Sequence, residues 1–193
     1  MALEPDAAGR ISRAAFASRS DETSSGFRLM PSGPHALATR LKLIQSAHRS
    51  LDLQYFIVQS DATGKEVLRL LRDAAQQGVR VRLLVDDLYT QDQDDLFRGL
   101  AAHDNVEIRL FNPFALRDAG VFARFAMQPL ASESLNHRMH NKLFIADGVA
   151  AITGGRNIGD EFFSRRDAGN FIDLDVLSVG PVVRQMAAQF DRY

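Results

Sequence analysis

The sequence predicts an α/β fold in which a mixed sheet is flanked by helices. Three apolar segments, at residues 50–58, 79–85 and 105–111, have the length and the branched or aromatic content of buried strands. Stretches of helical periodicity separate them, so the order is strand–helix–strand–helix–strand. That order is typical of a sheet with helices packed on its faces.

The helices of the first half carry their own start and stop signals. Ser32 and Pro34 precede a helix of apolar period near residues 34–44. Thr63 with Glu66 predicts a capping box at the start of a second helix, and Gly78 suits its end. A short third helix is expected at residues 96–101.

The second half predicts further strands. Residues 142–146 and 149–153 are two short strands joined by a turn at Asp147–Gly148. Residues 171–179 form another strand, and a helix begins at Pro181. Residues 113–135 are less regular and aromatic, which indicates either a substrate-facing loop or a short core helix.

The chain is expected to divide into a flexible lead-in at residues 1–30 and one domain at residues 31–193. The lead-in is rich in Ser, Asp and Arg and lacks sustained periodicity. The last helix runs to Tyr193 without a closing Gly, Pro or polar tail. That abrupt end predicts a domain truncated at its C-terminus.

Composition excludes several classes of function. The chain has no cysteine, which excludes thiol nucleophiles, disulfides and cysteine-ligated zinc. Its net charge of −1 argues against general binding of nucleic acid, because such binding needs an excess of basic residues. The sequence shows neither a bilayer-spanning apolar run nor a signal peptide, and it leaves peripheral contact with a membrane open.

One short pattern carries chemistry: His140, Lys142 and Asp147, spaced H-x-K-x-x-x-x-D. In an extended chain His140 and Lys142 point to the same face because the strand period is two. A neighbouring imidazole and ammonium suit an anionic phosphate, since the lysine neutralises charge while the histidine attacks or moves a proton. The alternative is a structural histidine beside a solvated lysine.

Gly154-Gly155-Arg156-Asn157 follows a predicted strand directly. Paired glycines let a backbone approach a ligand closely, and the N–H of Gly155 could face an anion. Asn157 adds a neutral amide donor. The alternative for the two glycines is a plain turn.

The stretch from His137 to Phe163, HRMHNKLFIADGVAAITGGRNIGDEFF, resembles the signature region of the phospholipase D superfamily. SGPHALATRLKLIQSAHRSLDLQYFIV, GVRVRLLVDD and NVEIRLFNPF resemble its bacterial cardiolipin synthase C branch. The resemblance runs from about Phe27 to Tyr193. It implies a phospholipase D-like αβα sandwich and a bacterial enzyme of phospholipid synthesis, cytoplasmic or peripheral at the inner membrane.

The resemblance also implies a two-step mechanism without metal or cofactor. His140 attacks phosphorus to form a phosphohistidine. The H-x-K-x-x-x-x-D pattern is called the HKD motif, and the histidine of a second HKD motif protonates the leaving alcohol. Lys142 and Asn157 bind phosphate oxygens. Asp147 supports the turn behind the site. Asp173 matches the carboxylate that orients the nucleophile, with Asp175 as its same-face alternative.

Other polar residues have two interpretations each. Asp86 and Asp87 end a predicted strand, where ligand contact and helix capping explain them equally well. Arg156 contacts an anionic head group or pairs with Asp160 or Glu161. His137 lines the pocket mouth or lies at the surface.

The chain departs from the family in one respect, because it holds a single HKD motif. It is expected to be either the N-terminal half of a two-motif synthase or a homodimer that shares one site. Phosphatidyl transfer in cardiolipin formation is the leading hypothesis, and its partners are a phospholipid or other phosphodiester and a second HKD domain. The alternatives are a metal-independent, nuclease-like homodimer and a non-catalytic half-domain.

Overall fold

A computed structural model describes residues 1–3, 9–18, 21, 23–90, 93–113 and 138–193. The region of residues 113–135, predicted to be a substrate-facing loop or a core helix, lies almost wholly outside the described residues. So does His137.

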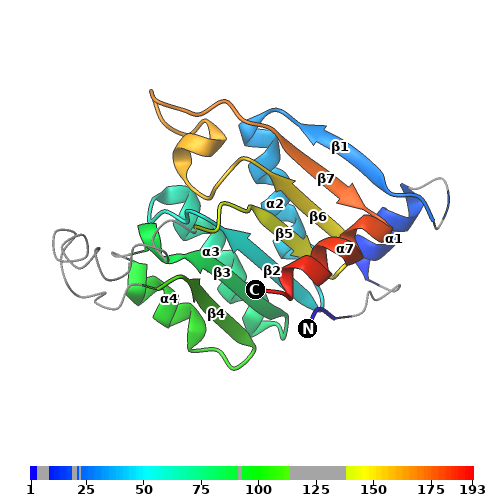
Figure 1. Ribbon diagram of the computed structural model, residues 1–193, viewed down its shortest axis with the longest axis horizontal. Helices are drawn as coiled ribbons and strands as arrows, with labels where there is room; N and C mark the ends of the chain where they lie inside the picture. Colours follow the sequence, from blue (N-terminus) through cyan, green and yellow to red (C-terminus); the bar gives the residue numbers. More distant parts are fainter. Residues whose placement is uncertain (4–8, 19–20, 22, 91–92, 114–137) are drawn as a thin grey trace.

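The described strands form one mixed sheet in the order β1-β7-β6-β5-β2-β3-β4 (Figure 1). The strands are β1 (Gly26–Met30), β2 (Ser50–Tyr55), β3 (Arg80–Asp86), β4 (Val106–Phe111), β5 (Leu143–Ala146), β6 (Ala150–Gly154) and β7 (Asp175–Val179). Strands β2, β3 and β4 pair in parallel, whereas β5 and β7 run antiparallel to their neighbours. The mixed sheet of the predicted fold class is confirmed.

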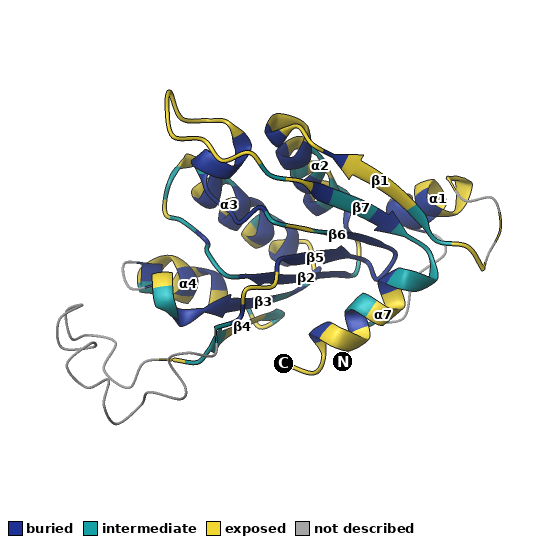
Figure 2. Cartoon of the chain, turned by 45° about the horizontal axis from the view of Figure 1, so that its top comes forward, coloured by how far each residue is buried: buried dark blue, intermediate teal, exposed yellow. Residues whose placement is uncertain are grey.

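Helices cover both faces of this sheet (Figure 2). They are α1 (Arg10–Ala17), α2 (Gly33–Ser46), α3 (Ala62–Gln76), α4 (Asp94–Ala101) and α7 (Pro181–Phe190), with 3₁₀ turns η1 (Asp87–Tyr89) and η4 (Asp160–Phe163). Helices α2 and α3 lie on one face and α7 on the other. Strand β5 has apolar side chains on both faces, so both faces need a cover. Phe144 and Ala146 join the core under α2 and α3. Leu143 and Ile145 join the core under α7.

Strand direction brings distant parts of the chain to one edge of the sheet. Strands β1, β2, β3, β4 and β6 end at this edge, and β5 and β7 begin there. We call it the His140 edge, defined by the ends of β2 at Tyr55 and β6 at Gly154 and the starts of β5 at Leu143 and β7 at Asp175. Every residue that connects these strands at that end is therefore a candidate neighbour of His140.

The described part of residues 1–30, where the sequence predicts a flexible lead-in, includes a helix and a strand. Helix α1 buries Ile11 and Ala15, and β1 pairs with β7 from Gly26 opposite Val179 to Met30 opposite Asp175. Local pattern could not show this strand, because its stabilising partner lies about 150 residues later in the chain and because Phe27 and Leu29 stay exposed at the sheet's edge.

The start of α3 differs from the predicted capping box. The N-cap is Asp61, whose carboxylate accepts the N–H of Gly64 at 2.9 Å. Thr63 instead donates its N–H and hydroxyl to Asp160, at 2.9 and 2.6 Å. Gly78 ends the helix as predicted, with a left-handed φ of 87°.

Asp147 lies at the opposite end of β5 from His140, in the turn that leads to β6. Asp147 and Gly148 both have positive φ, at 52° and 67°, as a two-residue hairpin turn requires. The buried carboxylate of Asp147 accepts the backbone N–H groups of His48, Arg49 and Ser50 at 2.8 to 3.1 Å. It therefore ties the hairpin to the start of β2 and stands away from the His140 edge.

We expect Asp147→Asn to lower the free energy of unfolding by about 2 kcal/mol, because a neutral amide cannot replace the buried carboxylate as the acceptor of all three backbone N–H groups. Denaturant unfolding measures the loss. Asp104→Asn, an exposed aspartate just before β4, is the matched control and should shift stability by less than about 0.5 kcal/mol. Equal stability of the two variants would contradict the assigned role.

Candidate active site

His140 and Lys142 approach the same aromatic ring at the His140 edge. The imidazole of His140 lies 5.0 Å from the ring centroid of Phe56, and the Nζ of Lys142 lies 5.4 Å from it. Nζ also donates to the carbonyl oxygen of His140 at 2.6 Å. His140 is exposed, whereas Lys142 is buried. The structure thus places the imidazole and the ammonium near one aromatic ring and leaves the imidazole open to a ligand.

Burial lowers the pKa of Lys142, and attraction to Asp173 opposes that shift. The ammonium has three N–H donors. Among the described residues its hydrogen-bond acceptor is the His140 carbonyl. A buried cation with donors to spare favours an anion at this position, because an anion would satisfy both the charge and the hydrogen bonds.

Asn157 lies at the same edge, after β6. Its Oδ1 accepts the backbone N–H of Ile57 at 3.0 Å. Because a backbone N–H can only donate, this contact identifies the side-chain oxygen and turns the amide nitrogen elsewhere. Within the described part of the chain Nδ2 makes no hydrogen bond, so its two N–H groups are available to a ligand.

Gly155 is placed for close approach rather than for donation. Its N–H donates to the carbonyl of Leu174 at 3.2 Å, which uses the group that the sequence assigned to an anion. A Cβ added at Gly155 would overlap both carboxylate oxygens of Asp173. The glycine therefore lets the Asp173 carboxylate lie against the turn, where it attracts Lys142.

Asp175, the alternative to Asp173, is engaged elsewhere. Its buried carboxylate pairs with Arg40 of α2 at 3.0 Å and with Arg156 at 3.3 Å. Arg40 also donates to the hydroxyl of Tyr55. Burial raises the pKa of Tyr55. Asp173 is accordingly the carboxylate that faces the His140 edge.

Arg156 is buried, which corrects both sequence interpretations of it. Its guanidinium donates to the backbone carbonyls of Met30, Pro31, Phe162 and Asp173. It contacts neither Asp160 nor Glu161, so it joins β1, η4 and the start of β7 instead of reaching a head group.

Sequence reasoning missed Phe56 and left Asp86 undecided. Phe56 follows β2 at its end and also packs edge-on against Tyr89, with centroids 5.3 Å apart. Asp86, at the end of β3, accepts the N–H of Met139, the residue before His140. The one signal for Phe56 in the sequence was its position at the end of a buried strand. The apolar pattern alone assigns such a phenylalanine to the core and not to a site.

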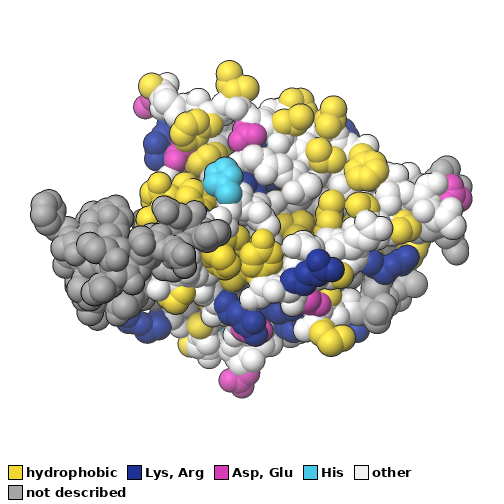
Figure 3. Space-filling model, in the orientation of Figure 1, with side chains coloured by type: hydrophobic (Ala, Val, Ile, Leu, Met, Phe, Trp, Pro, Cys, Tyr) yellow, Lys and Arg dark blue, Asp and Glu magenta, His cyan; other side chains and the backbone are white. Residues whose placement is uncertain are grey.

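Open surface at the His140 edge is partly apolar. Figure 3 shows hydrophobic side chains gathered on the face that it views, with a few charged ones between them. Phe171, Ile172 and Leu174 are exposed and flank Asp173, and Ile172 is fully exposed.

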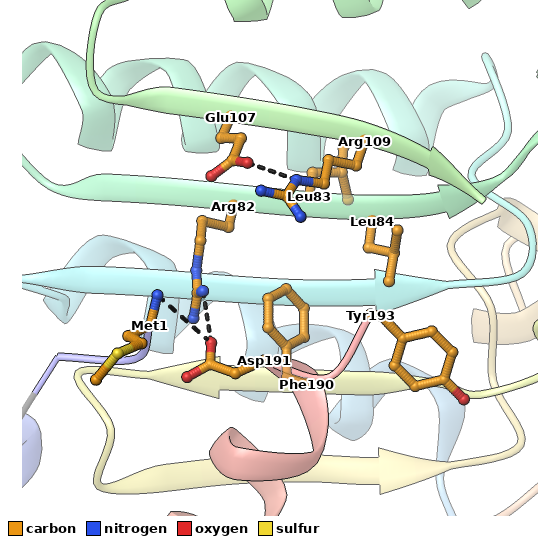
Figure 4. A pocket seen from close by; sticks show the side chains of 9 residues that line it. All are labelled: Met1, Arg82, Leu83, Leu84, Glu107, Arg109, Phe190, Asp191 and Tyr193. Carbon is orange, nitrogen blue, oxygen red and sulfur yellow. Dashed lines mark hydrogen bonds and ion pairs between the residues drawn. The ribbon is translucent and has the colours of Figure 1, made fainter.

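A separate pocket lies between α7 and strands β3 and β4 (Figure 4). Its charged groups pair with one another, Arg82 with Asp191 and Arg109 with Glu107.

The described residues contain no group of three or more His, Asp and Glu side chains placed to hold a metal ion. Of the helices in the described ranges, none has the length and hydropathy needed to cross a bilayer.

The protein family described as cardiolipin synthase, PLD-like domain, matches residues 41–193. The chain belongs to this family. Cardiolipin synthase C of Escherichia coli (strain K12) is 46% identical over 161 residues, which cover 82% of this chain and 33% of that protein. The cardiolipin synthase of Geobacillus kaustophilus is 28% identical over 163 residues, which are 84% of this chain and 30% of that protein. The chain spans about a third of the length of these curated relatives.

Solved structures share the fold of this PLD-like domain. NucT from Helicobacter pylori superposes with a TM-score of 0.62 over 88% of this chain and 94% of that chain, at 14% identity. A phosphatidylserine synthase from Haemophilus influenzae gives a TM-score of 0.65 over 86% of this chain and 36% of that chain, also at 14% identity. The predicted phospholipase D-like fold is confirmed.

The lowered pKa of Lys142 predicts an alkaline limit to anion binding by this PLD-like domain. The ammonium is lost as pH rises through that pKa, so affinity for diethyl phosphate, whose charge stays constant in this range, should fall with a midpoint below the ordinary lysine value of 10.5. NMR titration measures it. Lys142→Met should abolish binding, whereas exposed Lys65→Met should leave affinity and midpoint unchanged. Binding that survives in Lys142→Met would contradict the assignment.

Proposed function

We propose that this PLD-like domain supplies half of a phosphatidyltransferase or phosphodiesterase site in phospholipid synthesis, with His140 as nucleophile. The observation that carries the proposal is the exposed imidazole of His140 beside the buried ammonium of Lys142, both against Phe56. This juxtaposition suits attack on an anionic phosphate diester.

The proposed reaction has two steps. A ring nitrogen of His140 forms a bond to phosphorus while the bond from phosphorus to the leaving alcohol oxygen breaks, and an acid protonates that oxygen. An acceptor alcohol or water then loses a proton to the same group and attacks phosphorus, which releases the imidazole. Lys142 and the Nδ2 of Asn157 would bind phosphate oxygens, and the Asp173 carboxylate would orient the imidazole and stabilise its cationic form.

A second HKD domain is the proposed source of the acid. The cardiolipin synthases in the comparison align with this chain over only 33% and 30% of their own length, which supports a second half in the same polypeptide. The similarity to NucT over 94% of that chain supports the other route, in which a compact chain pairs with a copy of itself.

Substitution of His140 tests the chemistry in the full-length or dimeric protein. His140→Ala should lower turnover by about 10⁴-fold or more and abolish trapping of phosphate-labelled protein with a labelled phospholipid, because the residue forms the covalent bond. His48→Ala is the matched control, since His48 is exposed at the opposite edge and holds Asp147 through its backbone. Full turnover in His140→Ala would refute the proposal. A wild-type protein that never becomes labelled would favour a non-catalytic half-domain.

We propose further that the apolar residues around Asp173 contact the lipid surface from which the substrate is taken. Phe171 stacks on Phe162 at 5.1 Å, so its position is fixed although it is exposed, and Ile172 projects fully into solvent beside it. Exposed side chains of this kind at the mouth of a site favour peripheral insertion into the headgroup region. The proposed location is the inner face of a bacterial membrane.

Replacement of Ile172 tests this contact. Ile172→Asp should weaken co-sedimentation with phosphatidylglycerol vesicles by at least about tenfold, because burial of an isoleucine contributes about 2 kcal/mol and the carboxylate adds repulsion. Leu96→Asp, an exposed apolar position on α4, is the matched control. The proposal fails if both variants bind vesicles equally well. Unchanged cleavage of a water-soluble diester by Ile172→Asp would show that the chemistry is intact.

A further inference from the structure

The segment that carries His140 lies outside the regular structure. Strand β5 and its pairing with β2 begin at Leu143, so residues 138–142 belong to no strand and no helix. The ladder of the sheet therefore does not fix the backbone of His140. Something else must hold this segment if the imidazole is to keep one position.

The carboxylate of Asp86 holds it from the end of β3. Oδ2 accepts the backbone N–H of Met139 at 3.0 Å, and Oδ1 accepts from Nη1 of Arg138 at 3.1 Å. Oδ1 also accepts the N–H of Leu88 at 3.0 Å, which fixes the carboxylate itself. Asp86 is completely buried, so water does not compete for these contacts.

Side chains on both sides of His140 add weaker contacts. Gln54 donates to the Sδ of Met139 at 3.0 Å, and Asn141 donates to the hydroxyl of Tyr193 at 3.1 Å. The Asp86 carboxylate makes the charge-assisted hydrogen bond to the backbone next to His140, and such bonds are roughly twice as strong as neutral ones. The ammonium of Lys142 makes a second charge-assisted bond, to the carbonyl of His140 at 2.6 Å, but Lys142 belongs to the segment itself. Asp86 is therefore the charged anchor that holds this segment from another strand.

We infer that Asp86 is a positioning residue for His140. The inference rests on the proposed function, since it assigns Asp86 to the alignment of the nucleophile. The imidazole is fixed against Phe56 and beside Lys142 only while the Met139 amide stays on the carboxylate. A nucleophile displaced by about 1 Å loses about 10²-fold in rate.

Asp86→Asn separates positioning from binding. The amide keeps the shape of the side chain but cannot accept from Met139, Leu88 and Arg138 together. We expect kcat to fall by about 10²-fold in the full-length or dimeric protein while KM stays within about twofold, because Lys142 and Asn157 still bind the phosphate. Asp87→Asn is the matched control, because Asp87 is buried next to Asp86 in the chain and its carboxylate accepts the hydroxyl of Thr90. Its kcat should stay within about threefold of the wild-type value.

Amide hydrogen exchange tests the anchor without any assay of activity. In Asp86→Asn the amide of Met139 should exchange at least about tenfold faster, while Leu143 to Ala146 of β5 keep their protection, which shows local release without global opening. Faster exchange with an unchanged kcat would overturn the inference, and so would a lower kcat with unchanged exchange at Met139. Failure of the proposed function would appear separately, as full turnover in His140→Ala.

Discussion

The buried carboxylate of Asp175 is the constraint on which the rest of the site depends. It pairs with Arg40 and Arg156, and all three side chains are almost completely inaccessible to water. Loss of one partner from such a cluster leaves a buried charge without compensation, which is strongly unfavourable. The cluster therefore joins α2, the Gly-Gly-Arg-Asn turn and the start of β7 as one unit.

That unit determines the positions of the Asp173 and Asn157 side chains. Arg156 extends it to the carbonyls of Met30 and Asp173, so β1, β7 and the turn are held at one level of the His140 edge. Asp173 precedes this anchor by two residues and Asn157 follows Arg156 directly. Their side chains are thus positioned by a rigid ionic core beneath them, as precise sites require.

Local pattern predicted most of the sheet because its inner strands are continuous apolar runs. It placed His140 and Lys142 on one face of an extended strand. In the structure residues 138–142 belong to no strand, and both side chains approach the ring of Phe56. Local pattern could not assign Asp86, because the partner of that carboxylate is the Met139 amide, 53 positions away. It misplaced the role of Gly155 for the same reason, because only the fold shows the Asp173 carboxylate against it. What the sequence could not predict are contacts between residues far apart in the chain. Secondary-structure propensity was not the limit.

The fold by itself does not choose a substrate. NucT and a phosphatidylserine synthase superpose on this chain almost equally well, both at 14% identity, so the likeness shows the fold alone. The choice must come from the side chains around His140 and Lys142. Here the described surface offers exposed Phe171 and Ile172, on a chain of net charge −1. This rim supports the proposed lipid substrate, because a lipid diester presents its phosphate beside apolar chains and could use both the buried ammonium and the apolar rim, whereas a polyanion such as nucleic acid is attracted mainly by an excess of basic side chains.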